Sequence, residues 1–130
     1  MHSDPISDFL TRLRNAYKVR HETVTAPASK VKVEIAKILA AHGYLRSFEL
    51  VEKPFPMLKI TLRYHEGKEP SLQSITRISK PGRRVYIKHD QLRPIHNGFG
   101  ISIISTPQGL MTSRDARTKG LGGEVICELF

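Results

Sequence analysis

Apolar residues in the first half of the chain predict two amphipathic helices. Between residues 6 and 17 they recur at every third or fourth position. The pair Asp4-Pro5 in front of them supplies an N-cap acceptor followed by proline at the first helical position. Residues 31–39 show a second helical pattern. Ser29 before it can cap the helix, and Gly43 after it is expected to form a C-terminal cap of the kind that ends helices.

Three segments of the first half have strand character. They are residues 24–26, 44–51 and 57–64, and the last alternates cleanly between apolar and polar side chains. Residues 53–56, Lys-Pro-Phe-Pro, predict the turn between the second and third strands. The first half is therefore expected to have the order α-β-α-β-β. The polar segment 65–70, which contains glycine and proline and has no periodicity, is the best candidate for a boundary.

The second half consists mainly of predicted strands. They fall at residues 72–79, 84–88, 101–105, 110–111 and 124–130. One short helix, capped by Thr112 and ended by the glycines of residues 120–123, interrupts them. We therefore predict an α+β fold with an N-terminal half at residues 1–66 and a C-terminal half at residues 67–130, the latter mostly antiparallel β with one short helix.

Length and composition exclude several classes of protein. No apolar run in the 130 residues approaches the ~20 residues that a membrane span requires. The first eight residues contain two acids and no apolar stretch, so we expect no secretory signal. Cys127 is the single cysteine, which precludes an intrachain disulfide and suits a reducing cytosol. Without a CxxC pair, a zinc finger or ribbon is excluded.

The excess of positive charge favours a polyanionic partner. The chain has a formal net charge of +9, and both halves contribute to it. Cations are densest at residues 77–93, where Asp90 is the one acid and Tyr86 lies among them. An aromatic ring among cations can stack on a base or ribose while the cations hold phosphates. The alternative is a solvated strand with Tyr86 packed on a sheet.

Candidate catalytic and metal-binding side chains form no constellation. The six histidines never occur at HxH or HxxxH spacing, and the carboxylates lie among Lys and Arg rather than inside apolar runs. Ser102 and Ser105 do not lie in a G-x-S-x-G sequence. We expect no metal site and no Ser-His-Asp enzyme. A small hydrolase built on Ser105 is kept as one alternative. A DNA-binding protein that uses Arg12, Arg14 and Asn15 of the first helix is another.

Residues 105–109, Ser-Thr-Pro-Gln-Gly, predict a tight turn that is suited to contact RNA. Hydroxyl and backbone N–H groups in such a turn can reach the shallow minor groove of RNA, where the 2′-hydroxyls lie. Glu124 would repel phosphate if it faced the same way. It therefore points elsewhere, orients hydroxyls and amides as an acceptor, or is a solvated strand end.

Several segments together resemble the family of small-subunit ribosomal protein eight, in its bacterial form. They match in order and at consistent spacing over almost the whole chain. The segments are residues 4–15, 27–30 (Pro-Ala-Ser-Lys), 78–82 (Ile-Ser-Lys-Pro-Gly), Arg84, Tyr86, 100–106 (Gly-Ile-Ser-Ile-Ile-Ser-Thr), 109–112 (Gly-Leu-Met-Thr) and 120–124 (Gly-Leu-Gly-Gly-Glu).

The resemblance implies a non-enzymatic constituent of the small ribosomal subunit, in the cytoplasm and without a cofactor. It implies direct binding to the central domain of the small-subunit ribosomal RNA and a part in its assembly. It implies contact with neighbouring ribosomal proteins such as the fifth, and repression of translation from the messenger RNA of its own operon. It also implies that the two halves pack together and that the C-terminal half binds RNA.

The resemblance further implies which residues contact RNA. The turn at position 105 would face the RNA, the aromatic ring would stack on it, and the loop before the last strand would support the turn. The first helix and the start of the second would add cations. The residues so implied are Ser105, Thr106, Pro107, Tyr86, Arg84, Lys30, Arg12, Arg14, Gly122, Gly123 and Glu124.

The chain departs from the family pattern in that turn. The usual Ser-Thr-Ser-Lys-Gly is Ser-Thr-Pro-Gln-Gly here, so Pro107 has neither hydroxyl nor N–H and Gln108 has no charge. Because proline fixes φ at about −65°, the turn is expected to be stiffer and to donate fewer hydrogen bonds. We expect Ser105, Thr106 and Tyr86 to sustain binding.

Overall fold

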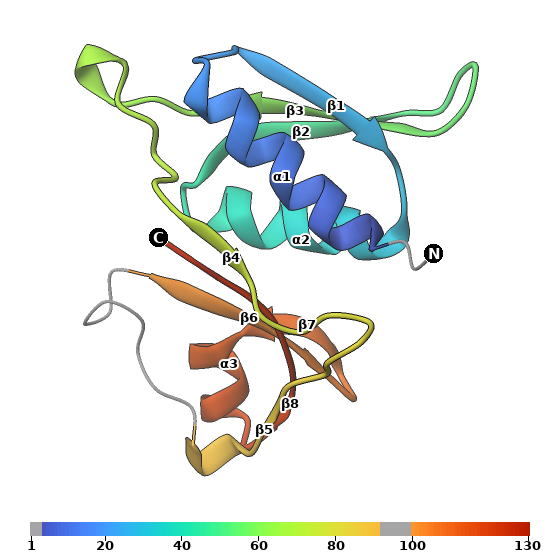
Figure 1. Ribbon diagram of the computed structural model, residues 1–130, viewed down its shortest axis with the longest axis vertical. Coiled ribbons are helices and arrows are strands. Elements are labelled where there is room, and N and C mark those ends of the chain that lie inside the picture. Colours follow the sequence, from blue (N-terminus) through green and yellow to red (C-terminus); the bar gives the residue numbers. More distant parts are fainter. Residues whose placement is uncertain (1–3, 92–99) are drawn as a thin grey trace. The chain divides into compact units, whose positions relative to one another are not determined.

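The structure is a computed structural model that describes residues 4–91 and 100–130 (Figure 1). These residues form two compact units: an N-terminal unit of residues 5–73, and a C-terminal unit of residues 74–130 together with Asp4. The described ranges contain three α-helices and two antiparallel sheets, so the predicted α+β class is confirmed. The domain boundary between residues 66 and 67 stays a prediction.

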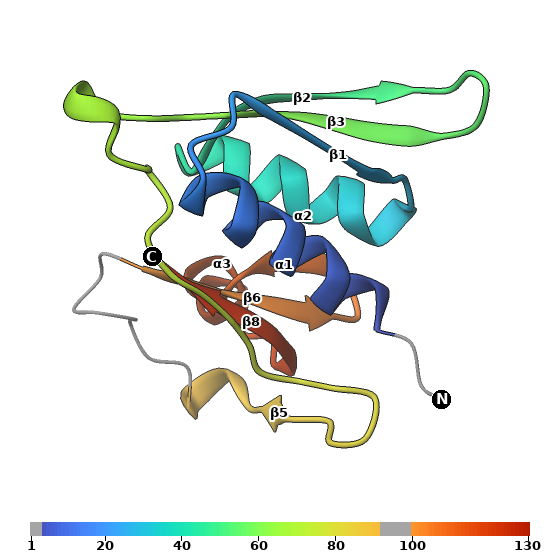
Figure 2. The same cartoon turned by 45° about the horizontal axis from the view of Figure 1, so that its top comes forward.

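In the N-terminal unit, two helices lie against one face of a three-stranded sheet (Figure 2). The sheet has the order β1-β3-β2, with antiparallel neighbours. The elements are α1 (Pro5–Lys18), β1 (Thr23–Pro27), α2 (Lys30–Ala41), β2 (Leu45–Val51), β3 (Met57–Leu62) and the 3-10 turn η1 (Glu66–Lys68).

Local signals explain where the helices of this unit begin and end. The Ser29 hydroxyl accepts a hydrogen bond from the backbone N–H of Lys32 at 3.3 Å, which caps α2 as predicted. Gly43 follows the last turn of α2 with φ of +79°, a conformation that favours glycine. The predicted apolar stripe of α1 is buried at Phe9, Leu10, Leu13 and Tyr17.

The C-terminal unit is a five-stranded sheet with one short helix. Its main path has the order β4-β8-β6-β7, and β5 also pairs with β8. The elements are β4 (Ile75–Arg77), β5 (Tyr86–Ile87), the 3-10 turn η2 (His89–Gln91), β6 (Ile101–Thr106), β7 (Gly109–Thr112), α3 (Ser113–Thr118) and β8 (Gly123–Leu129). The Thr112 hydroxyl caps α3, as predicted.

Helix α3 covers one face of this sheet. Ala116 of α3 packs with Ile104, Met111 and Val125 in a buried cluster. Strands β4 and β5 are shorter than the predicted segments 72–79 and 84–88, and residues 80–83 between them form a turn. Neighbouring positions of a strand point to opposite faces, so Ser105 and Glu124 lie on the face away from α3.

Candidate nucleic-acid interface

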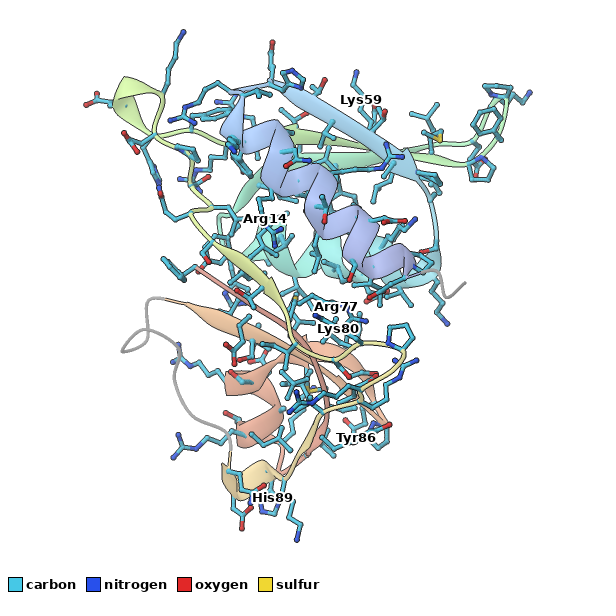
Figure 3. All side chains as sticks on the ribbon, viewed as in Figure 1. Arg14, Lys59, Arg77, Lys80, Tyr86 and His89 are labelled. Atoms are coloured by element: carbon cyan, nitrogen blue, oxygen red, sulfur yellow. The ribbon has the colours of Figure 1, made fainter. Side chains whose placement is uncertain are left out.

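Three of the predicted site residues lie side by side across the C-terminal sheet. In the antiparallel register, Glu124 of β8 lies opposite Tyr86 of β5 on one side and opposite Ser105 of β6 on the other. Directly opposed residues of neighbouring strands point to the same face, so these three side chains form one row, here called the polar row. Tyr86 is 71% exposed, and Ser105 and Glu124 are half-buried. Figure 3 labels Tyr86 in the C-terminal unit.

Two glycines allow the strands of the polar row to approach one another. A Cβ atom on Gly123 would lie 2.0 Å from the carbonyl oxygen of Ser105. A Cβ atom on Gly122 would lie 2.5 Å from the carbonyl oxygen of Ile87, the residue after Tyr86. Both distances are far inside van der Waals contact, so any larger residue would push β8 away from the strands on either side. The glycines therefore fix the spacing of the row.

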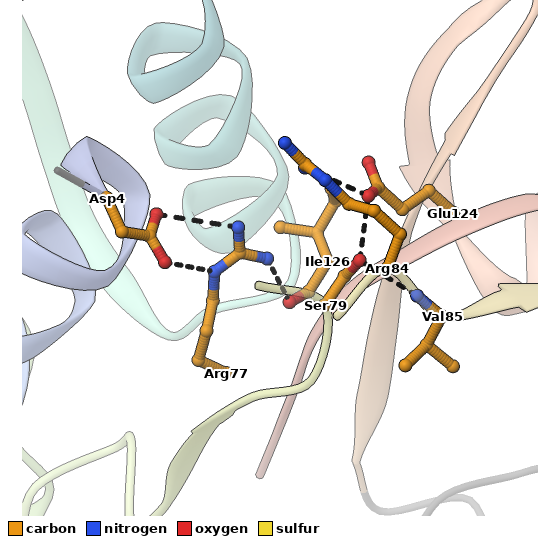
Figure 4. A network of polar contacts seen from close by, with 7 residues as sticks. All are labelled: Asp4, Arg77, Ser79, Arg84, Val85, Glu124 and Ile126. Atoms are coloured by element: carbon orange, nitrogen blue, oxygen red, sulfur yellow. Dashed lines mark hydrogen bonds and ion pairs between the residues drawn. The ribbon is translucent and has the colours of Figure 1, made fainter. Parts of the chain in front are cut away.

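Glu124 is an acceptor that organises its neighbours, which decides between the interpretations left open from the sequence. Its carboxylate accepts hydrogen bonds from the Ser79 hydroxyl at 2.7 Å and from the Arg84 guanidinium at 3.0 Å (Figure 4). The Ser79 oxygen in turn accepts from the backbone N–H of Val85 at 3.1 Å. The carboxylate thus fixes the chain just before Tyr86. Arg84 compensates its charge and is still 48% exposed.

Replacing Glu124 by glutamine is expected to lower the free energy of unfolding by about 1–3 kcal/mol. The charge-assisted hydrogen bonds from Ser79 and Arg84 would weaken, at a side chain that is only 16% exposed. Denaturant unfolding followed by circular dichroism measures the change. Glu128→Gln is the matched control, because in the described part of the chain the Glu128 side chain has no hydrogen bond or ion pair. Equal losses from both variants would contradict this account of Glu124.

The 106–109 turn, Thr106-Pro107-Gln108-Gly109, uses most of its polar groups internally. The Thr106 hydroxyl donates to the carbonyl oxygen of Gly109 at 2.8 Å and accepts from the backbone N–H of Gln108 at 3.1 Å. Thr106 is only 9% exposed, whereas Pro107 and Gln108 are exposed at the tip. The Ser105 hydroxyl, by contrast, has no hydrogen bond with any described residue. The Ser105 hydroxyl is therefore available to bond a ligand, whereas the Thr106 hydroxyl stabilises the turn.

The three cations predicted in the first half all lie in the N-terminal unit. Arg12 and Arg14 are exposed on α1, and Lys30 is exposed at the first position of α2. Arg14 is labelled in Figure 3. The Arg12 guanidinium donates to the carbonyl oxygen of Thr25 at 3.2 Å. The structure thus places these residues in a different unit from the polar row.

Two functional details were missed from the sequence. Arg77 belongs to the basic segment 77–93, yet its side chain is only 8% exposed. It pairs with Asp4 at 3.2 Å and donates to the carbonyl oxygen of Ile126 at 2.7 Å. No local signal marks this pairing. Ser79 was not singled out, although serines next to turns commonly bond nearby backbone N–H groups. Arg93, the last cation of the basic segment, lies outside the described residues.

Three further features of residues 4–91 and 100–130 are the grouping of their metal-ligating side chains, the length and apolarity of their helices, and their cysteine. No group of three or more metal-ligating side chains occurs there, and no helix in these ranges is long and apolar enough to cross a membrane. Cys127 is buried in β8, and this burial raises the pKa of its thiol to about 12. Because the thiolate is the reactive form, Cys127 is inert at neutral pH.

Comparison of the sequence with known proteins identifies the family of this chain. The family model for ribosomal protein S8 matches residues 4–130. The chain belongs to the ribosomal protein S8 family. It is 52% identical to small ribosomal subunit protein uS8 of Clostridium beijerinckii and of Caldanaerobacter subterraneus subsp. tengcongensis, and 44% identical to that of Acidobacterium capsulatum. Each match covers 98% of this chain and 98% of the relative.

Membership of the S8 family confirms the resemblance found in the sequence. The chain is a structural, non-enzymatic ribosomal protein, so a hydrolase built on Ser105 is excluded. These relatives are named as small ribosomal subunit proteins, and the small subunit of bacteria is cytoplasmic, which agrees with the location expected from the sequence.

Proposed function

We propose that this chain binds the central domain of the small-subunit ribosomal RNA directly and helps to assemble the small subunit. The polar row is the main contact. The observation that carries the proposal is the register of β5, β8 and β6, which puts the exposed ring of Tyr86 and the open hydroxyl of Ser105 on one face, on either side of Glu124.

The chemistry of the polar row suits a folded RNA helix. The Tyr86 ring stacks on a base or ribose, and base–aromatic stacking tolerates different sequences because every base has a π-face. The Ser105 hydroxyl both donates and accepts, as does the 2′-hydroxyl that it would meet in the minor groove. Arg84, held by Glu124, presents its remaining N–H groups to a phosphate.

The other implied residues support this contact. Gly122 and Gly123 fix the strand spacing, and Thr106 with Pro107 stiffens the turn beside Ser105. Lys30, Arg12 and Arg14 add phosphate contacts from the N-terminal unit. Such contacts supply affinity and register rather than sequence specificity.

Binding of the purified chain to a transcribed central-domain fragment tests the proposal. A fragment of equal length from another domain of the same RNA, and a DNA duplex, serve as competitors. We expect the central-domain fragment to bind tightest in moderate salt. Equal or tighter binding to the DNA duplex would favour the alternative in which α1 reads DNA bases, and would overturn the proposal.

Gln108→Lys is expected to steepen the salt dependence of RNA binding. Gln108 lies exposed at the tip of the 106–109 turn, where a lysine could reach one further phosphate. The slope of log K against log salt should then grow in magnitude by about 0.7–0.9. Titrations at several salt concentrations measure the slope. An unchanged slope would show that the tip of this turn does not face the RNA backbone.

Two further partners belong to the proposal. We expect contact with neighbouring small-subunit proteins, the fifth among them, and binding to the messenger RNA of the chain's own operon as a translational repressor. If the messenger presents a similar helix, it occupies the same polar row. The central-domain fragment should then compete with the messenger for the protein.

A further inference from the structure

A second turn beside the polar row, the 80–83 turn, carries two cations on a rigid frame. It comprises Lys80, Pro81, Gly82 and Arg83. The backbone N–H of Lys80 donates to the carbonyl oxygen of Arg83 at 2.9 Å, and that of Arg83 donates to the carbonyl oxygen of Lys80 at 2.9 Å. These reciprocal bonds make the two residues a cross-strand pair, so their side chains leave the same side of the turn.

The 80–83 turn lies at the same end of the sheet as the 106–109 turn (Figure 1). After β4 the chain runs antiparallel to β8, because the N–H groups of Ile78 and Ser79 donate to the carbonyl oxygens of Ile126 and Val125, each at 3.1 Å. The chain leaves β8 after Ser79 and returns at Val85, whose carbonyl oxygen accepts a hydrogen bond from the backbone N–H of Val125 at 2.9 Å. The 80–83 turn therefore lies beside β8 close to its beginning, shortly before Tyr86. The 106–109 turn follows Ser105, which lies opposite Glu124 at that same end. The two turns thus flank the polar row.

The cations of the 80–83 turn have no acidic partner. Lys80 and Arg83 are exposed, and neither side chain forms an ion pair or hydrogen bond with a residue in the described ranges. The nearby carboxylate of Glu124 is already occupied by Ser79 and Arg84. Like charges directly opposite each other destabilise a strand pair, so an anion placed between Lys80 and Arg83 would relieve a repulsion that the free protein carries.

The two turns that flank the polar row differ in charge. The 106–109 turn has no charged residue, whereas the 80–83 turn has two cations and no acid. We propose that the 80–83 turn is a second phosphate-binding element, with Lys80 and Arg83 gripping the backbone of the RNA strand whose sugar edge lies on the polar row. This inference rests on the proposed function and adds the source of the phosphate contacts at this end of the sheet.

The test compares two double variants with the same loss of charge. Lys80→Gln with Arg83→Gln removes the cations of the 80–83 turn and keeps Pro81 and Gly82. Arg117→Gln with Lys119→Gln removes two exposed cations at α3, on the opposite face of the sheet. Each protein is titrated with the transcribed central-domain fragment at several salt concentrations. Thermal unfolding checks that each variant is folded.

The first double variant should reduce the magnitude of the salt slope by about 1.4–1.8, which corresponds to two lost phosphate contacts. The α3 variant should leave the slope close to that of the unchanged protein. Equal slopes for the two double variants, reduced or not, would overturn the inference while the polar row stands. If the unchanged protein fails to bind the fragment, the proposed function fails, and this inference fails with it.

Discussion

Replacing Tyr86 by alanine is expected to weaken binding to the central-domain fragment by about 1–3 kcal/mol, or roughly 5- to 150-fold. The ring is 71% exposed, so it contributes little to the core, and its loss should be felt mainly by a ligand that stacks on it. Equilibrium titration gives the loss of affinity. Denaturant unfolding of the same variant should show a change below about 0.5 kcal/mol.

Phe55→Ala is the matched control for Tyr86. Phe55 is also an exposed aromatic residue, 61% exposed, but lies between β2 and β3 in the N-terminal unit. Its removal should leave the affinity for RNA within about twofold of the original value. If Tyr86→Ala retains full affinity and instead lowers the melting temperature, the ring packs on the sheet and the stacking interpretation is wrong.

Gly123→Ala is expected to lower the free energy of unfolding by about 3 kcal/mol or more, at the upper end of overpacking effects. The added Cβ would lie 2.0 Å from the carbonyl oxygen of Ser105, and that oxygen belongs to the backbone of a central strand. No side-chain rotation can relieve such a clash, so β6 and β8 would have to separate. Denaturant unfolding measures the loss, and failure to obtain folded protein agrees with it.

Gly82→Ala separates this steric effect from the general cost of replacing glycine. A Cβ atom on Gly82 would have no heavy atom within 4 Å, and its φ lies outside the left-handed region. We expect a change of no more than about 0.5 kcal/mol, since alanine also reduces the entropy of the unfolded chain. Similar losses at Gly82 and Gly123 would show that the close approach of β8 to Ser105 does not set the stability.

The sequence predicts those features of the fold that are encoded within a few residues. The cap of α2 at Ser29, the end of that helix at Gly43 and the cap of α3 at Thr112 all follow from local hydrogen bonding or from backbone freedom. The β6–β7 hairpin follows from its turn residues. Each of these is found in the structure where it was expected.

What the sequence could not predict depends on partners far along the chain. Arg77 looks like one more surface cation until the fold brings it to Asp4, 73 positions away. Glu124 acquires its function from Ser79 and Arg84, which are 45 and 40 positions away. The Thr106 hydroxyl bonds within its own turn, which is a local interaction. The sequence alone does not distinguish a threonine whose hydroxyl bonds its own turn from one whose hydroxyl faces a ligand.

Directed cleavage of RNA from one position on the protein can show which face of the C-terminal sheet lies on the RNA. Because Cys127 is buried and its thiol has a pKa raised to about 12, a cysteine introduced by Gln108→Cys can be labelled selectively with an iron chelate that generates hydroxyl radicals. Arg117→Cys on α3 places the same label on the opposite face of the sheet. Both proteins are bound to the small-subunit ribosomal RNA.

We expect strong cleavage from position 108 at one helix of the central domain, and weak or no cleavage of that helix from position 117. Cleavage of the helix from position 117 with none from position 108, in proteins that bind the RNA equally well, would contradict it.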